Sequence, residues 1–214
     1  PRPHPTHVLT QAIGDLLPAA VGVALSPVPI IAVILMLGTP KARTNGLAFA
    51  AGWVAGLVVV SVIVLTAADG ASDPDSATST GIDWAQVVIG SIFLAMAAKQ
   101  WRSRPRPGHE VAMPAWMATI DTFTPAKALV IGAALSGVNP KNLALTAAAV
   151  SPLAQLDLSS GDLAAAVAVF VVVASLTVAG PVLAYLAAPE AAAARLASVK
   201  EFLTVHNAVI MMIV

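Results

Sequence analysis

The 214-residue chain is too apolar to be an ordinary soluble domain. Hydrophobic residues make up 58% of it and charged residues only 10%, whereas soluble domains carry roughly 25% charged residues. So few charges cannot cover the surface of a soluble protein, and the remaining apolar surface must face lipid. A formal net charge of zero gives no field that would attract nucleic acid, and the absence of cysteine excludes disulfides and thiolate chemistry.

Runs without charged side chains predict six membrane-spanning helices, because a bilayer core about 30 Å thick requires about 20 apolar helical residues. In chain order these runs are 16–40, 44–68, 84–98, 128–140 with 142–156, 163–189 and 202–214. Lys141 alone separates the two runs of the fourth span, which we treat as one interrupted helix. None of the runs alternates as a transmembrane barrel strand does, so the predicted fold is an all-α integral membrane protein.

The distribution of Lys and Arg predicts the orientation of the spans. The loops after the first, third and fifth spans are basic, with Lys41, Arg102 and Arg195 among their residues. The alternate loops, 69–83 and 151–162, contain aspartate and neither Lys nor Arg. We therefore expect the 1–2, 3–4 and 5–6 loops in the cytoplasm and the N-terminus outside, in a multi-pass protein of the cytoplasmic (inner) membrane.

The segment 101–123 precedes the fourth span and is less apolar than its neighbours. Its last part places Ile120 and Phe123 among apolar residues at helical spacing, which favours a helix lying along the cytoplasmic interface. Thr124 and Pro125 then provide an N-cap and a first-turn proline for the fourth span.

A short internal repeat indicates that the chain consists of two related halves. Seven-residue stretches that begin at Gly22 and Gly132 agree at five positions, an offset of 110 residues that carries span one onto span four. Pro29 follows one copy and Asn139-Pro140 the other, so helix interruptions recur at corresponding places. Three spans in each half make the halves inverted relative to each other. The expected organisation is a single membrane domain, 1–214, with repeat one at 12–100, an interfacial segment at 101–123 and repeat two at 124–214.

The two interruptions predict a central substrate site. Ser26 and Asn139 are good N-caps before prolines, so each can start a half-helix whose free N–H groups favour an anion. Lys141 adds a full positive charge at membrane depth, where an ionisable residue is functional by default. The alternative is that Lys141 lies at a membrane interface and has no role in binding. The expected substrate-binding residues are Ser26, Pro27, Pro29, Ser136, Asn139, Pro140, Lys141 and Asn142.

Other polar and charged residues near the spans are candidates for gating or coupling, with local hydrogen bonds or ion pairs as the alternative explanation. These candidates are Asp121, Lys127, Asn45, His206 and Asn207. On the second span, Ala48, Gly52 and Gly56 form a small-residue stripe, which predicts close helix packing within the chain or in a homodimer.

The sequence offers no set of residues suited to covalent chemistry. The four histidines are scattered without metal-ligand spacing, and there is no Ser/His/Asp arrangement and no phosphate-binding glycine loop. We therefore expect a protein that is not an enzyme and that needs neither a metal nor a cofactor.

Ordered short motifs along the chain resemble those of a known family. The interruptions at 26–29 and 139–142 and the six-span layout resemble the lysine-exporter-like (LysE) transporter superfamily. The motifs that look like its GAP branch are Thr39-Pro40, Asn45-Gly46, Gly52-Trp53, Gln100-Trp101-Arg102, Pro114–Met117, Ile120-Asp121, Thr124-Pro125, Val138–Asn142 and His206-Asn207. That branch comprises actinobacterial membrane proteins implicated in delivering glycopeptidolipids or sulfolipids to the cell surface.

The resemblance implies a transporter that moves an envelope (glyco)lipid or lipid precursor with an anionic head group across or out of the cytoplasmic membrane. Its partners would be membrane lipids, the lipid or lipid-linked substrate, and a second copy or a larger lipid-export complex, with no nucleic acid. Two alternatives stay open: an exporter of small solutes such as amino acids or cations, and a non-transporting adaptor of a larger lipid-export complex.

Overall fold

The computed structural model describes residues 5–72 and 115–192, together with residues 91, 95 and 98. This part of the chain is helical and contains no strand. The expected sixth span, 202–214, and nearly all of the third, 84–98, lie outside the described residues, as do the basic 3–4 and 5–6 loops. The predicted all-α membrane fold is therefore confirmed as a helical architecture, while the count of six spans stays a prediction.

The first expected span is an interrupted pair of helices, as the sequence predicts. Helix α1 (Pro5–Ala24) and helix α2 (Pro27–Leu37) are bent by 55° relative to each other. Ser26 has an extended backbone, and Pro27 has no N–H to continue the hydrogen-bond ladder, so a new helix begins there. Taken together, the two helices are long and apolar enough to cross a membrane once.

Helices α3 (Ala42–Ser72) and α7 (Ser160–Ala187) correspond to the second and fifth spans. Within the described residues, these two helices are each long and apolar enough to cross a membrane on their own. The bent pair α1–α2, counted as one span, would be a third. Their outward faces carry large apolar side chains that water would not favour, among them Val59, Val62, Ile63, Val172, Leu176 and Leu183. The structure thus supports a membrane protein.

The fourth expected span is also interrupted at its proline. Helix α5 (Pro125–Gly137) is followed by α6 (Pro140–Val150) and by the 3-10 helix η3 (Ser151–Gln155). The Thr124 hydroxyl accepts the Lys127 N–H (3.3 Å), which confirms the predicted cap of α5. The half-helices after the two breaks, α2 and α6, both contain 11 residues and both begin with proline.

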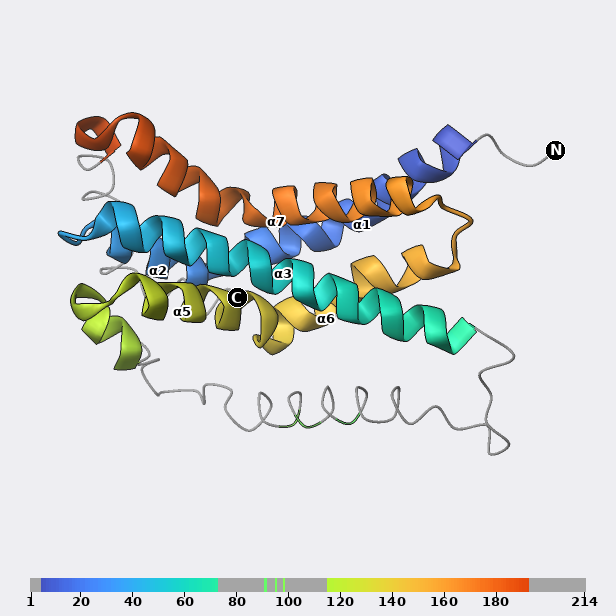
Figure 1. Ribbon diagram of the computed structural model, residues 1–214, viewed down its shortest axis with the longest axis horizontal. Helices are drawn as coiled ribbons and strands as arrows, with labels where there is room; N and C mark the ends of the chain where they lie inside the picture. Colours follow the sequence, from blue (N-terminus) through green and yellow to red (C-terminus); the bar gives the residue numbers. More distant parts are fainter. Residues whose placement is uncertain (1–4, 73–90, 92–94, 96–97, 99–114, 193–214) are drawn as a thin grey trace, which may run out of the picture.

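The helices lie side by side in a bundle (Figure 1). The pair α1–α2 runs through it in one direction, whereas α5–α6 runs in the opposite direction. Helix α1 packs against α6 and α7, and α3 packs along α5. Large, fully buried side chains from several parts of the chain belong to the core: Leu16, Phe49, Trp53, Phe123 and Phe170.

The small-residue stripe of α3 packs within the chain. A Cβ atom added at Gly52 would overlap the Leu129 carbonyl oxygen of α5, and one added at Gly132 would overlap the Phe49 carbonyl oxygen of α3. Glycine on both helices therefore allows their backbones to approach each other closely. Of the two possibilities left open by the sequence, the structure places this stripe against α5 rather than on a free surface.

The end of the segment before α5 packs partly into the core. It forms the 3-10 helix η2 (Ala115–Thr122) rather than an α-helix. Ile120 and Phe123 are buried, and the Asn45 side-chain N–H donates to the Phe123 carbonyl (3.0 Å). Its last residues therefore fasten the start of α5 to α3, and the interfacial position of the segment stays a prediction.

Candidate functional site

The two helix breaks meet inside the bundle. The Ser26 hydroxyl, at the start of α2, donates a hydrogen bond of 2.8 Å to Oδ1 of Asn142, in the first turn of α6. The two residues are 116 positions apart in the chain, and both are buried. This bond joins the two halves of the chain at the points where the helices are interrupted.

Side chains also satisfy the backbone carbonyls that each break leaves unpaired. Asn142 Nδ2 donates to the Leu135 carbonyl (3.0 Å) in the last turn of α5. The Thr177 hydroxyl of α7 donates to the Ala24 carbonyl at the end of α1. A terminal helix carbonyl has no partner within its own helix, so these contacts stabilise both breaks in a low-dielectric interior.

The N-terminal ends of the two half-helices differ. Asn139 accepts the Lys141 N–H (3.0 Å) and caps α6 as predicted, whereas the Ser26 side chain makes no cap and turns to Asn142 instead. In α2, the prolines at positions 27 and 29 carry no N–H, and the Ser26 carbonyl takes the Ile30 N–H (3.4 Å). The start of α6 is occupied in a similar way, since Pro140 has no N–H and the Leu143 N–H donates to the Asn139 carbonyl (2.9 Å). What distinguishes α6 for an anion is the charge of Lys141.

Lys141 lies beside the buried pair but is itself exposed at the start of α6. Its ammonium group can therefore reach a ligand at the edge of the bundle while Asn142, the next residue, faces the interior. The partial positive charge of the α6 N-terminus and the full charge of Lys141 add at this position.

Two of the predicted substrate-binding residues lie away from the junction of the breaks. The Ser136 hydroxyl donates to the Ala133 carbonyl of its own helix (3.1 Å) and packs against Gly56 of α3. Ser136 therefore belongs to the contact between α3 and α5. Pro29 is buried inside α2, whereas Pro27 and Pro140 are the first residues of the two half-helices.

The gating candidates also differ in their surroundings. Asp121 and Lys127 are both exposed, and the structure gives no ion pair between these two residues; the Lys127 ammonium lies 4.3 Å from the centroid of the Phe123 ring. Asn45 is buried and holds the Phe123 carbonyl, which is a structural contact. His206 and Asn207 lie outside the described residues.

Sequence reasoning missed several buried hydroxyl groups. Thr177 closes the end of α1, and Thr146 follows Asn142 by one turn on the same face of α6. The hydroxyl groups of Ser61, Thr146 and Ser175 are buried without a hydrogen-bond partner in the described part of the chain. The sequence contains a signal for two of these residues, because Ser175 and Thr177 are hydroxyl residues in the middle of an otherwise apolar run.

The chemistry available at this junction is that of binding. It offers neutral hydrogen-bonding side chains inside the bundle and one cation at its margin. Among the described residues there is no group of three His, Cys, Asp or Glu side chains that could hold a metal ion.

Helices α3 and α7, each of spanning length, and two interrupted helix pairs joined by a buried polar pair define a helical membrane protein with a polar centre. A family model described as Sap, sulfolipid-1-addressing protein, matches residues 16–214, and the chain belongs to this family. No curated protein and no solved structure matches it. The match confirms the resemblance to the GAP branch and connects the chain with the addressing of lipids, whereas the wider superfamily placement stays a prediction.

Proposed function

We propose that this protein is a transporter that moves an envelope lipid or lipid precursor with an anionic head group across or out of the cytoplasmic membrane. The observation that carries the proposal is the Ser26–Asn142 hydrogen bond between the two helix breaks. Membership of a sulfolipid-addressing family supports a lipid as the substrate. Broken helices that meet at the centre of a bundle are the usual place for a transporter's substrate site.

The proposed mechanism uses two inverted halves of three spans each. Support comes from the opposite directions of α1–α2 and α5–α6 and from the equal lengths of α2 and α6. If the halves rock against each other, the Ser26–Asn142 bond opens and the polar centre becomes accessible to a head group. The bond closes again once the lipid has left, so each side of the membrane is reached in turn.

Lys141 provides the electrostatic part of this mechanism. Its exposed ammonium attracts the anionic head group to the start of α6, where the helix dipole also favours negative charge. Asn142 then exchanges its bond with Ser26 for a bond to the head group. A small cationic solute would be repelled at the same position, which favours the lipid over the solute-exporter alternative.

The test compares Asn142→Leu and Lys141→Gln with wild-type protein at equal membrane levels, in a host that lacks its own copy. The measurement is the fraction of the sulfated envelope lipid found at the cell surface, by lipid extraction and mass spectrometry. Each variant should lower it about tenfold, the factor that a loss of roughly 1.4 kcal/mol of a charged or buried hydrogen bond produces. Lys41→Gln, a substitution in the exposed turn after α2, is the matched control and should leave it unchanged. Normal surface lipid in both site variants would contradict the proposed site.

Reconstitution separates the transporter from the adaptor. Purified chain in liposomes that contain a head-group-labelled anionic lipid should move the label between leaflets without any other protein. No movement in liposomes, combined with loss of surface lipid in the Lys141→Gln cells, would indicate an adaptor instead. Efflux of a soluble amine from the same liposomes would indicate a small-solute exporter.

A further inference from the structure

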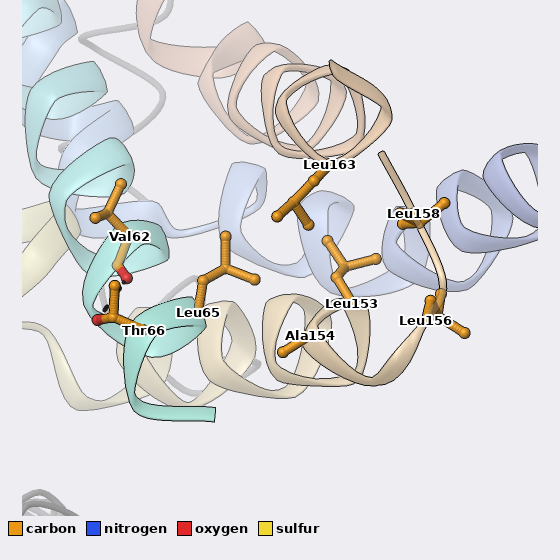
Figure 2. A pocket seen from close by; sticks show the side chains of 8 residues that line it. All are labelled: Val62, Leu65, Thr66, Leu153, Ala154, Leu156, Leu158 and Leu163. Atoms are coloured by element: carbon orange, nitrogen blue, oxygen red, sulfur yellow. Dashed lines mark hydrogen bonds between the residues drawn. The ribbon is translucent and has the colours of Figure 1, made fainter. Parts of the chain in front are cut away.

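A second candidate site lies away from the paired breaks, at the far end of α3. A cavity of about 430 Å³ opens between the last turns of α3, the helix η3 and the start of α7. Figure 2 shows the side chains that line it, which come from these three elements and from the loop between η3 and α7. They are Val62, Leu65, Thr66, Leu153, Ala154, Leu156, Leu158 and Leu163.

The lining carries no charge and no free hydrogen-bonding side chain. Thr66 is its one polar side chain, and the Thr66 hydroxyl donates to the carbonyls of Val62 and Ile63 in its own helix (3.0 Å each). Backbone groups add some polar surface to the wall, but its side chains are predominantly apolar, as in most sites for small apolar ligands. The complementary occupant is an uncharged hydrocarbon group.

The cavity opens beside the apolar outer surface of α3. Leu153 is 3% exposed and lies at its floor, whereas Val62 is 51% exposed at its rim. The apolar surface continues from Val62 to the neighbouring exposed side chains Val59 and Ile63 of the same helix. A chain of methylene groups could therefore enter sideways from the bilayer without crossing a polar surface.

Size narrows the choice of occupant. The volume lies in the range of small-molecule sites, roughly 300–1,000 Å³. A helix from a second copy has a diameter of about 10–12 Å with its side chains and would cover the opening rather than fill the cavity. An acyl chain is narrow, flexible and uncharged, which matches both the volume and the lining.

We propose that this cavity binds an acyl chain of a membrane-embedded lipid. Its place on a transport path rests on the proposed function: α6 and η3 run from the polar junction at Asn142 to Leu153, so head-group and acyl sites would lie at the two ends of one half-helix. Eleven helical residues span about 16 Å. A lipid could thus leave its head group near α6 while one tail occupies the cavity.

The test uses photolabelling of the full chain. Wild-type protein is reconstituted in phosphatidylethanolamine vesicles containing a phosphatidylglycerol with a diazirine at the end of one acyl chain, and labelled residues are mapped by mass spectrometry. Labels should concentrate on Leu65, Leu153 and Leu156. Labelling that is no denser there than on the exposed residues Val172 and Leu176 of α7 would overturn the proposal.

A filled cavity supplies the second measurement. Ala154→Trp places an indole in the cavity and should lower labelling there on the order of tenfold, the effect of losing contact with about two methylene groups. Val172→Trp, at a site 62% exposed, is the matched control and should label as wild type does. Unchanged labelling in folded Ala154→Trp, or a disulfide-linked dimer of Leu156→Cys that excludes the probe, would also overturn it.

The acyl site and the proposed transport can fail separately. Acyl labelling requires no movement of lipid, so wild-type protein should label in the cavity whether or not the lipid crosses between the leaflets of the same vesicles. A protein that labels in the cavity but moves no lipid keeps the acyl site and loses the transporter proposal. A protein that moves lipid without labelling the cavity keeps the transporter proposal and loses the acyl site.

Discussion

Ser26 and Asn142 depend on each other because each is buried where water cannot replace a lost partner. Removing the Asn142 side chain would leave both the Ser26 hydroxyl and the Leu135 carbonyl without a partner. Removing the Ser26 hydroxyl would leave only Asn142 Oδ1 unsatisfied. The asymmetry means that Asn142 contributes more to stability than Ser26 does.

A double-mutant cycle tests this dependence. Asn142→Ala should lower the free energy of unfolding more than Ser26→Ala, and the pair should show a coupling of about 0.6–1.7 kcal/mol, the range found for hydrogen bonds between membrane helices. The measurement is denaturant unfolding in mixed micelles. Ser26→Ala combined with Thr39→Ala is the control, because Thr39 donates to Met36 in its own neighbourhood and should add independently. Additivity in the Ser26–Asn142 pair would show that the bond contributes nothing.

At the scale of helices, proline and its cap made the breaks predictable. A proline preceded by Ser or Asn favours the start of a new helix, and both α2 and α6 begin at such a proline. The direction of the Ser26 side chain could not be predicted, because its partner lies 116 residues away and local patterns carry no information about it. For the same reason, neither the contact of Thr177 with Ala24 nor the cavity could be predicted, because both form where separate elements meet.

The packing partner of the α3 stripe was equally hidden from the sequence, since glycine spacing permits an internal or an external contact. The structure shows α5 in that place. It also places Ile120 and Phe123, at the end of 101–123, in the core beside a short 3-10 helix. Tertiary contacts decided both outcomes.

The contact between α3 and α5 yields a prediction about glycine. Gly52→Ala should destabilise the protein by about 1–3 kcal/mol, because its methyl group would meet the Leu129 backbone, which cannot turn aside as a side chain can. Gly14→Ala in α1 is the matched control, with no atom within 4 Å of the added carbon. It should be neutral or stabilising by about 0.5–1 kcal/mol. Thermal unfolding in detergent would compare them, and equal midpoints would contradict the close contact.

For the molecule as a whole, the direction of transport depends on which end of the bundle faces the cytoplasm. The turn between α2 and α3, which contains Lys41, lies at one end of the bundle, and the loop before α7, which contains Asp157, lies at the other (Figure 1). The basic residues of the first loop predict that Lys41 is cytoplasmic. The acyl cavity, close to Asp157, would then lie in the outer half of the membrane.

Two single cysteines decide this orientation, since the chain has no cysteine of its own. Both Lys41 and Asp157 are exposed, so either position accepts a thiol reagent without unfolding. In intact cells a membrane-impermeant maleimide should label Asp157→Cys, whereas Lys41→Cys should react only after the membrane is opened. The reverse pattern would mean that the Asp157 end of the bundle faces the cytoplasm. The cavity would then lie in the inner half of the membrane and serve as an entry point for lipid. The expected pattern would place the cavity in the outer half of the membrane, on the side toward which an exported lipid moves.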